Sequence, residues 1–299
     1  MKIASIIVTY NRLSFLKKSI KESIKCGFDY IVIVNNNSTD GTNKFLENLK
    51  VKNIYIINME ENVGGAGGFY YGFKYVVENL NADWIVCYDD DAYPLNNVVK
   101  EFKNINENLN EDVVAIASAV YLPNGSISKM NIPRLNFLKK FRIYIDGNAY
   151  KKIDCIEVFM SSFVGFFIKT EYIKTFSHFP KKELFIYGDD LLYTLRISQN
   201  NKKIIFCPNI KFIHDCMTLK NDTYNPMWKV YFTYRNGIIL YKNIHIILGV
   251  VYAILKFISF ISRVNKYKNK KLYKKYIILA IIDAFKNKLP SIDKIKDLK

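Results

Sequence analysis

Three consecutive carboxylates at the end of an apolar run are the first residues in this sequence with the means to do chemistry. The run 84–88 ends in Asp89, Asp90 and Asp91. Adjacent carboxylates repel one another and are costly to desolvate, so a bound cation would offset that cost. On an extended segment alternate side chains share a face, so Asp89 and Asp91 can bind one Mg²⁺ or Mn²⁺ while Asp90 points elsewhere. The alternative is a solvated acidic turn before Pro94.

A second acidic pair, Asp189 and Asp190, comes much later in the sequence, directly after Gly188. One of two adjacent carboxylates can be positioned as a general base. The alternative is that both stabilise the start of a helix through its macrodipole. His214 follows two short apolar segments. It is a candidate metal ligand, although a lone histidine can also be structural.

A glycine-rich segment, residues 62–69, is the third chemical signal, with four glycines among residues 64–68. Glycine permits positive φ angles and a close approach of another molecule to the backbone. A helix predicted from Phe69 to Leu80 would direct its first N–H groups at an anion such as a diphosphate. The alternative is a tight turn between a strand and a helix that packing alone requires.

The elements that would position these residues alternate as β-α-β-α-β. Strands are predicted at 3–8, 30–34 and 54–57, because these runs are apolar and free of charge. A helix is predicted from Ser14 as N-cap to Cys26, with Gly27 as its stop. The alternation predicts a parallel sheet with right-handed crossovers, where ligands bind beyond the carboxyl ends of the strands. The polar segments expected at that edge are 9–12, 35–40, 62–68 and 89–91.

The α/β pattern continues beyond the acidic triplet, except in residues 121–155. That stretch loses the alternation, and we expect an irregular segment that could line an acceptor cleft. The later elements predicted from periodicity are a helix at 96–109, a strand at 113–120, a long strand at 158–168 bent at Gly165, a helix from Gly188, and short strands at 204–206 and 211–213.

Composition points to a basic protein with a sizeable core. The chain has 299 residues, is 50% hydrophobic and carries a formal charge of +17, which suggests an anionic partner. Its five cysteines are an odd number without C-x-x-C spacing, so we expect reduced thiols in a cytosolic compartment, and neither a disulfide framework nor a zinc site. No signal peptide is predicted, because the first apolar segment is only strand-length.

The last third of the chain is apolar and basic. Residues 238–262 are apolar but interrupted by charges, and the longest uncharged piece, 243–255, is shorter than the roughly 20 residues of a spanning helix. A lysine cluster with interleaved tyrosines follows at 266–276, then an apolar helix at 276–285. This pattern predicts peripheral association with an anionic membrane surface. The alternatives are a helical bundle with a solvated lysine face, or nucleic-acid binding, for which no motif is present.

Taken together, these segments resemble family 2 glycosyltransferases of the GT-A fold over about residues 1–240. The resemblance implies a Rossmann-like, mostly parallel α/β sheet with helices on both faces, plus a C-terminal helical extension. The glycine-rich segment 62–69 resembles the galactofuranosyl- and rhamnosyltransferase branch. The motifs that carry the resemblance are Val8-Thr9-Tyr10-Asn11-Arg12, Asn36-Asn37-Ser38-Thr39-Asp40-Gly41-Thr42, Tyr88-Asp89-Asp90-Asp91 and Gly188-Asp189-Asp190.

The resemblance implies a role for each matching residue. Asp89 and Asp91 would bind Mn²⁺ or Mg²⁺, and His214 is similar to a further metal ligand. Asp190 would deprotonate the acceptor hydroxyl, with Asp189 as its partner at the acceptor. The residues implied at the nucleotide-sugar donor are Thr9, Tyr10, Arg12, Asn35, Asn37, Asp40, Asn62, Gly64, Gly65, Gly67, Gly68 and Asp90.

Two positions depart from the family pattern. Asn35 stands where the family usually has Asp. An Asn can still accept a hydrogen bond from a base N–H, but it brings no charge, and this bears on base preference. Leu192 stands where relatives often carry a third acid, and this bears on the acceptor contacts.

The resemblance implies an inverting, metal-dependent sugar transfer from a nucleotide-diphosphate donor, with UDP-galactofuranose as the first choice. The expected acceptor is a glycan or lipid-linked molecule of bacterial capsule or O-antigen synthesis, on the cytoplasmic face of the plasma membrane. The expected organisation is a catalytic domain at 1–222, with a donor half at 1–120 and an acceptor half at 121–222, and a membrane-associating extension at 223–299. The alternatives are a rhamnosyl- or other hexosyltransferase, a nucleotidyltransferase, and a non-catalytic membrane or nucleic-acid adaptor.

Overall fold

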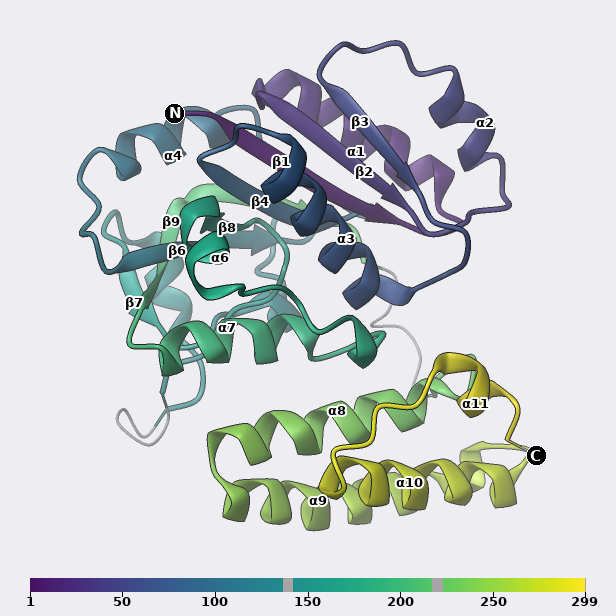
Figure 1. Cartoon of the computed structure of the whole chain (residues 1–299). Coiled ribbons are helices and arrows are strands. Elements are labelled where there is room, and N and C mark those ends of the chain that lie inside the picture. Colours follow the sequence, from purple (N-terminus) through teal and green to yellow (C-terminus); the bar gives the residue numbers. More distant parts are fainter. Residues whose placement is uncertain (137–141, 217–222, 299) are drawn as a thin grey trace.

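A mixed sheet lies at the centre of the computed structural model (Figure 1). The structure describes residues 1–136, 142–216 and 223–298. The strands are β1 (Ile3–Thr9), β2 (Tyr30–Asn35), β3 (Ile54–Asn58), β4 (Trp84–Asp89), β5 (Ala92–Pro94), β6 (Val113–Tyr121), β7 (Ile156–Val158), β8 (Phe166–Lys169) and β9 (Lys203–His214).

The order of the strands is β3-β2-β1-β4-β8-β6-β9-β5, with β7 paired on β9. The parallel pairings join β3, β2, β1 and β4, and also β6 with β9. β8 runs antiparallel to both of its neighbours, β4 and β6. The predicted β-α-β-α-β start and the Rossmann-like α/β class are therefore confirmed, while one antiparallel strand interrupts the sheet at its middle.

Helices cover both faces of this sheet, because its strands are apolar on both sides. Along β1, Ile3 and Ile7 contribute to one core with α1, α2 and α4, whereas Ile6 and Val8 contribute to another with α3, α6 and α7. The bounds of these helices are α1 (Leu13–Cys26), α2 (Thr42–Glu47), α3 (Gly64–Asn79), α4 (Val98–Asn106), α6 (Thr170–Phe176) and α7 (Asp189–Gln199).

Helix α1 shows what the sequence could and could not predict about a helix end. Its C-terminal stop is the predicted Gly27, in the left-handed conformation at φ 75°. Ser14 is not the N-cap, because the helix already begins at Leu13. The N–H of Leu13 donates to the distant carboxylate of Asp40 at 3.0 Å, so a side chain from another loop replaces a local cap.

The glycine-rich segment is the first turn of α3, so the helix predicted from Phe69 starts five residues earlier than expected, at Gly64. Packing explains the glycines inside the helix. A Cβ on Gly68 would lie 2.4 Å from Cγ1 of Val8, and one on Gly72 would lie 2.6 Å from Cγ2 of Ile6. Helix α3 therefore packs directly on β1 at a distance that larger residues would not permit.

The apolar run 158–168 does not form the single strand that we predicted. β7 ends at Val158, where the run begins, and pairs with β9, while β8 begins at Phe166 near the end of the run and enters the sheet between β4 and β6. The two strands predicted at 204–206 and 211–213 are one strand, β9, with an irregularity in its pairing to β6 between Cys207 and Lys211. Periodicity alone does not reveal which neighbour a short apolar run will find.

A disulfide corrects the expectation of five reduced thiols. The sulfur atoms of Cys155 and Cys207 are bonded. Ile156 pairs with Phe206 in the antiparallel ladder of β7 and β9, so the two cysteines stand opposite each other just beyond it. Cys26 and Cys87 are buried thiols. Cysteine spacing could not show the pairing, because the sheet creates it across 52 residues.

The described residues of the C-terminal part form four α-helices and one short 3₁₀ helix (Val264–Lys266), below the sheet in Figure 1. Residues 217–222 lie outside the described residues, and the boundary predicted at 222 falls at their end. The apolar segment 238–262 is two helices that meet at His245. Among the described helices, none combines the length and the apolar character that a membrane crossing requires. The helices are α8 (Lys229–Ile244), α9 (Ile246–Ile261), α10 (Lys270–Phe285) and α11 (Ile292–Lys296).

Candidate active site

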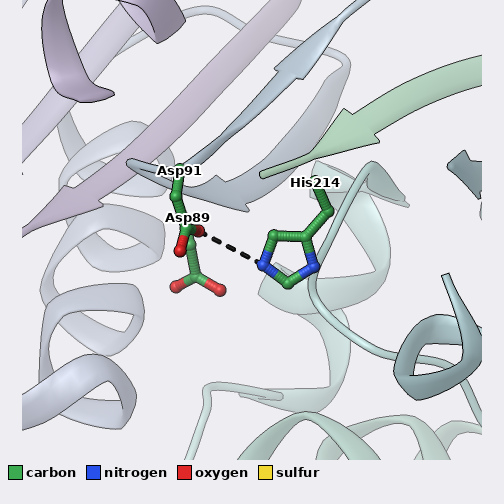
Figure 2. A group of neighbouring side chains, drawn as sticks. All are labelled: Asp89, Asp91 and His214. Carbon is green, nitrogen blue, oxygen red and sulfur yellow. Dashed lines mark ion pairs between the residues drawn. The ribbon is translucent and has the colours of Figure 1, made fainter. Parts of the chain in front are cut away.

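Two strand ends bring together Asp89, Asp91 and His214, which we call the strand-end cluster (Figure 2). Asp89 ends β4, and His214 ends β9. Pairing of Ala92 with His214 in the β5–β9 ladder brings the histidine to the acidic segment. One ligand atom from each of the three residues lies within 4.8 Å of the others. Two carboxylates and an imidazole at this spacing fit the donor set of a Mn²⁺ or Mg²⁺ ion.

The contacts of the histidine leave one ring nitrogen directed at the carboxylates. Nδ1 of His214 lies 2.8 Å from Oδ1 of Asn131, an acceptor that holds the ring with its proton on Nδ1. Nε2 lies 3.2 Å from Oδ1 of Asp91. Oδ1 of Asp91 is buried and accepts no well-directed hydrogen bond from the described residues. A bound cation would supply the partner that this oxygen lacks. Asn131, in η1 (Lys129–Asn131), was not among the predicted site residues.

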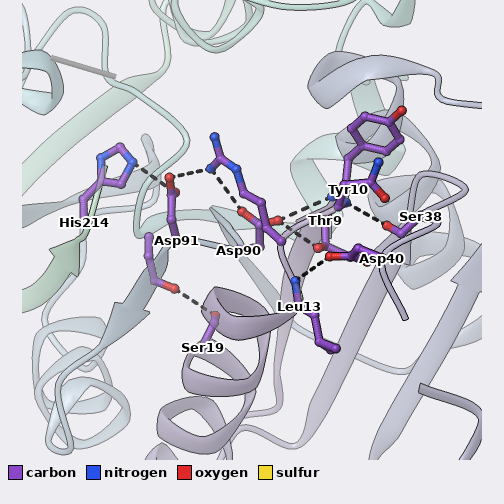
Figure 3. A network of polar contacts seen from close by, with 12 residues as sticks. Thr9, Tyr10, Leu13, Ser19, Ser38, Asp40, Asp90, Asp91 and His214 are labelled. Carbon is purple, nitrogen blue, oxygen red and sulfur yellow. Dashed lines mark hydrogen bonds and ion pairs between the residues drawn. The ribbon is translucent and has the colours of Figure 1, made fainter. Parts of the chain in front are cut away.

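Arg12 neutralises part of the acidic segment, whose carboxylates Asp90 and Asp91 are labelled in Figure 3. Its Nη1 lies 2.6 Å from Oδ2 of Asp91 and 3.4 Å from Oδ1 of Asp90. Asp90 also accepts hydrogen bonds from Oγ1 of Thr9 at 2.8 Å and from the N–H of Tyr10 at 3.4 Å. Asp90 thus turns away from the strand-end cluster and towards the end of β1. Thr9, Tyr10 and Arg12, all predicted at the donor, converge on this carboxylate.

Burial and mutual repulsion shift the pKa values of these carboxyls. Burial, together with the charge of Asp91, raises the pKa of Asp89 to about 7. Burial also raises the pKa of Asp90 to about 6. Burial would raise the pKa of Asp91 too, but contact with His214 and the charge of Arg12 lower it overall. A cation bound here would favour the ionised form of all three groups.

In the loop after β2, the residues predicted to contact the nucleotide-sugar donor form hydrogen bonds with other residues of the protein. Asn35 is fully buried: its Oδ1 accepts the N–H of Ser38 at 3.1 Å, and its amide donates to Asn58 at 2.9 Å and to Asn43. Asn37 donates to the carbonyl of Glu60 at 2.8 Å. The side chain of Asn35 is thus held by partners within the protein, and its expected contact with a nucleotide base stays a prediction.

The predicted donor residue Asp40 in the same loop also has structural partners. Its carboxylate accepts from Leu13 at the start of α1 and from Oγ1 of Thr42 at 2.6 Å, at the start of α2. It thereby joins two helices beside Thr9 and Arg12. Its contact with a nucleotide stays a prediction.

The glycine-rich turn differs from one glycine to the next. Gly64 has φ 74°, and a Cβ there would lie 2.2 Å from the carbonyl oxygen of Phe185. A Cβ on Gly67 would lie 2.7 Å from Cβ of Val63, and one on Gly68 would lie 2.4 Å from Cγ1 of Val8. Only at Gly65, among the predicted glycines, does the Cβ position meet nothing within 4 Å in the described residues. Oδ1 of Asn62 accepts the N–H of Gly64 at 2.9 Å and so closes the turn. Packing thus accounts for three of the four glycines.

Asp189 and Asp190, which we call the helix-start pair, begin α7 as predicted, with Gly188 before them at φ 78°. Oδ1 of Asp190 accepts the N–H of Leu191 at 2.7 Å. Burial raises the pKa of Asp190. Burial also raises the pKa of Asp189 well above its usual value, with the charge of Asp190 next in importance and that of Asp89 contributing.

The helix-start pair and the strand-end cluster act on the same point of the sheet. Cys87 lies on β4, two residues before Asp89, on the face of the sheet that α3 and α7 cover. Burial raises the pKa of its thiol, and the charges of Asp89 and Asp190 add to the rise. The charge of Asp89 also contributes to the raised pKa of Asp189, so both acidic groups influence the same buried region around β4.

Two buried side chains of α8 hold the turn that leads into the helix-start pair. Nδ2 of Asn236 lies 3.0, 2.8 and 2.8 Å from the carbonyl oxygens of Leu184, Ile186 and Tyr187. Nη2 of Arg235 donates to the carbonyl of Leu184 at 3.2 Å, and the whole side chain is buried. Neither residue was predicted at the site, because each acts through the backbone of a segment some fifty residues earlier.

The backbone of that turn is strained. Phe185 has φ 66° and ψ −64°, and the N–H of Ile186 donates to the carbonyl of Leu184 at 2.8 Å, which makes a γ-turn of the rarer hand. Tyr187 also has a positive φ, of 65°. Residues other than glycine rarely adopt such backbone angles unless neighbouring groups impose them. We call Arg235 and Asn236 the α8 clamp, because their hydrogen bonds fix this backbone just before Asp189.

Comparisons with known proteins identify what this geometry is similar to. The model of the family described as glycosyl transferase family 2 matches residues 5–173. No curated protein sequence matches the chain significantly.

Solved structures share the fold at low sequence identity. S. aureus TarS 1–349 in complex with UDP has 18% identity and a TM-score of 0.53, over 79% of this chain and 65% of that one. The mannosyltransferase PcManGT from Pyrobaculum calidifontis, in complex with GDP-Man and Mn²⁺, has 13% identity and a TM-score of 0.58, over 96% of this chain and 88% of that one. GalNAc-T7 with UDP, GalNAc and Mn²⁺ has 13% identity and a TM-score of 0.60, over 81% of this chain and 48% of that one.

Proposed function

The chain belongs to glycosyl transferase family 2 and is a glycosyltransferase, and from this premise we propose that it moves a sugar, with inversion, from a nucleotide-diphosphate donor to an acceptor hydroxyl. One observation supports the proposal: Asp89, Asp91 and His214 bring their ligand atoms within 4.8 Å of one another, as a metal site requires, and the charge of Asp89 contributes to the raised pKa of Asp189 in the helix-start pair. Such a site needs a cationic side to receive the leaving diphosphate and an anionic side to receive the acceptor proton.

The strand-end cluster would hold Mn²⁺ or Mg²⁺ through Asp89, Asp91 and His214. The bound ion would neutralise charge on the leaving diphosphate. Oδ1 of Asn131 accepts a hydrogen bond from Nδ1 of His214 and so keeps Nε2 directed at that position. Arg12, already 2.6 Å from Asp91, supplies a second positive charge on the same side. Mn²⁺ in the structures of PcManGT and GalNAc-T7 supports this assignment.

Asp190 would act as the base. Its carboxylate takes the proton from the acceptor hydroxyl while that oxygen bonds to the anomeric carbon, and the bond from this carbon to the diphosphate oxygen breaks with its electron pair. The raised pKa of Asp190 favours proton uptake. Asp189 would orient the acceptor beside it. Inversion follows because the attacking and leaving oxygens lie on opposite faces of the anomeric carbon.

The donor is proposed to be a nucleotide sugar, with UDP-galactofuranose as the first choice and a rhamnosyl or another hexosyl donor as the alternative. UDP and UDP-GlcNAc in TarS, and GDP-Man in PcManGT, support a nucleoside-diphosphate donor in general terms. Thr9, Tyr10 and Arg12, which converge on Asp90, would lie beside it. The backbone at Gly65, with nothing beyond it within 4 Å in the described residues, offers a close approach for the sugar or diphosphate.

The acceptor is proposed to be a glycan or lipid-linked molecule in bacterial surface polysaccharide synthesis, such as capsule or O-antigen. Residues 1–222 would form the catalytic domain, with the donor half at 1–120 and the acceptor half at 121–222. Residues 223–299 would associate peripherally with the inner face of the plasma membrane. The lysines of α10 and the apolar exposed side chains of α9 support this last part.

A panel of nucleotide sugars tests the function. The purified chain is incubated with each donor and candidate acceptors, with Mn²⁺, with Mg²⁺ or with a chelator, and the released nucleotide is identified. We expect nucleoside diphosphate release that depends on the metal and on the acceptor. Release of pyrophosphate instead would identify a nucleotidyltransferase, and no turnover with any donor would favour a non-catalytic adaptor.

A further inference from the structure

Helix α9 exposes a continuous apolar stripe. Its inner face packs through Gly249, Ala253 and Phe260, which are buried. On the outer face the exposed fraction reaches 64% at Ile258 and 63% at Leu255. Soluble monomers rarely expose so many large apolar side chains side by side. The exposed members of the stripe are Ile246, Ile247, Val250, Val251, Ile254, Leu255, Phe257 and Ile258.

The exposed stripe of α10 is apolar at one end and basic at the other. The apolar residues Ile278, Ile282 and Phe285 are exposed on its second half. The lysines Lys271 and Lys274 are exposed on its first half, at positions three or four residues apart that share one helix face. The two halves of one face therefore differ in chemistry.

Contacts within the bundle place these two stripes together. Nζ of Lys242, near the end of α8, lies 2.6 Å from Oδ1 of Asn287, so the apolar end of α10 lies where α8 ends and α9 begins. The hydroxyl of Tyr273 donates to the carbonyl of Phe260 at 2.9 Å, so the lysine end of α10 lies where α9 ends. In Figure 1 both helices lie on the side of α8 that faces away from the sheet. We call the exposed stripes of α9 and α10 the outer face.

The charge on the outer face itself is positive. Residues 223–299 contain sixteen lysines and arginines and three acidic residues, of which Asp293 and Asp297 belong to α11 and its end and Asp283 belongs to α10. Asp283 is buried and accepts a hydrogen bond from the hydroxyl of Tyr231 at 2.7 Å. The described surface of α9 and α10 therefore presents apolar groups and cations without an exposed carboxylate.

We propose that the outer face docks on a bilayer of anionic lipids, with α9 lying in the plane of the interface and the lysine end of α10 among the headgroups. An anionic lipid surface supplies the negative charge that this face lacks, whereas a second copy of the chain would add more cations. With 16 residues, α9 is about 24 Å long, shorter than the roughly 30 Å of a hydrocarbon core, which suits a helix lying flat. The inference rests on the membrane association in the proposed function, but its test needs no sugar transfer.

Vesicle flotation with the full chain tests the proposal. We expect the protein to float with phosphatidylcholine vesicles that contain phosphatidylglycerol, to bind pure phosphatidylcholine weakly, and to detach progressively as salt rises. Ile247→Glu combined with Ile254→Glu should lower partitioning more than tenfold, because both residues would enter the interface. The matched control is Ile153→Glu, at a side chain that is 80% exposed and lies outside the outer face; it should float like the unaltered protein.

The basic end has its own pair of variants. Lys271→Gln combined with Lys274→Gln should lower partitioning by on the order of thirtyfold, about fivefold for each lysine. Lys50→Gln combined with Lys52→Gln, at exposed lysines far from this face, should have little effect. Circular dichroism and sedimentation accompany every variant. The proposal would be overturned if neither set of substitutions changed flotation. It would also be overturned if the protein did not bind vesicles and instead formed a dimer that Ile254→Glu dissociates.

Discussion

The strand-end cluster and the helix-start pair are both acidic, but the fold builds them in different ways. Asp89, Asp91 and His214 take their positions from strands of the sheet, through the pairing of β4 with β1 and of β5 with β9. Asp189 and Asp190 follow a turn with positive φ angles that the α8 clamp holds from outside the sheet.

This difference makes the two groups separable by mutation. Substitutions around the cluster should change ion binding, and substitutions around the pair should change proton transfer. The predictions below aim to break or sharpen that division, and the largest expected effect comes first.

Removing the base should have the largest effect. Asp190→Asn keeps the shape of the side chain but cannot take a proton at neutral pH. We expect kcat for sugar transfer to fall by about 10²–10⁴-fold, while Mn²⁺ affinity measured by calorimetry stays unchanged. Asp112→Asn, which breaks a surface ion pair with Lys203, is the matched control and should keep full activity. Near-normal turnover in Asp190→Asn would mean that another group is the base.

Breaking the α8 clamp should weaken the pair without touching the cluster. Asn236→Asp preserves size but replaces the amide donor that three carbonyl oxygens share, and it brings negative charge to them. We expect kcat to fall by on the order of a hundredfold, because a displacement of about 1 Å at a catalytic group has that cost.

In Asn236→Asp the affinities for Mn²⁺ and for the nucleotide-sugar donor should equal those of the unaltered protein within error. Both are measured per folded protein, so that a loss of folded protein is not mistaken for a loss of kcat. Asn243→Asp, at an exposed amide near the end of the same helix, is the control. Equal losses of ion affinity and kcat would argue against the division.

The converse experiment weakens the cluster without touching the pair. Asn131→Ala removes the acceptor for the Nδ1 proton of His214, so the ring loses its fixed orientation. We expect Mn²⁺ affinity to drop by about 10–100-fold, the usual cost of losing such a partner. At saturating Mn²⁺, kcat should recover. Asn124→Ala, at an exposed turn, should leave the affinity unchanged. An unchanged ion affinity in Asn131→Ala would show that His214 does not ligate the ion.

The smallest effect concerns the support behind α7. Burial lowers the pKa of His178 from 6.5 to about 4, and its Nε2 lies 3.1 Å from the carbonyl of Tyr193. The unfolded chain therefore binds this proton more readily than the folded one, and stability falls as the pH drops below about 6.5. Between about pH 6 and about pH 5 the loss should be about 1 kcal/mol. In denaturant titrations His178→Gln should show a shallower decline, and equal slopes would contradict the prediction.

Local sequence signals predicted much of the fold and the two acidic groups of the candidate site. Gly27 ends α1, and Gly188 precedes α7, because both adopt a left-handed conformation that glycine tolerates. Alternating faces on the strand also placed Asp89 and Asp91 together and Asp90 apart. These features depend on residues close together in the sequence.

Features that depend on distant partners were not predictable. The first turn of α3 lies against the carbonyl of Phe185, more than a hundred residues later, and the Cys155–Cys207 bond is set by the pairing of β7 with β9. Asn131 and Asn236 likewise act through groups 83 and about fifty residues away. In each case the deciding neighbour lies on another element, which periodicity and turn propensity do not encode.

The α8 clamp also determines how short a working version of this protein can be. A truncation after residue 222 would keep the nine strands of the sheet and both acidic groups. It would also remove Arg235 and Asn236, so the turn before Asp189 would lose the side-chain donors that oppose its strain. A fragment chosen by inspecting the sheet alone would contain the proposed ion ligands, but the backbone before the proposed base Asp190 would lack the hydrogen bonds that fix it. In the proposed function, the helices after the sheet would therefore help to position Asp190 as well as bind the membrane surface.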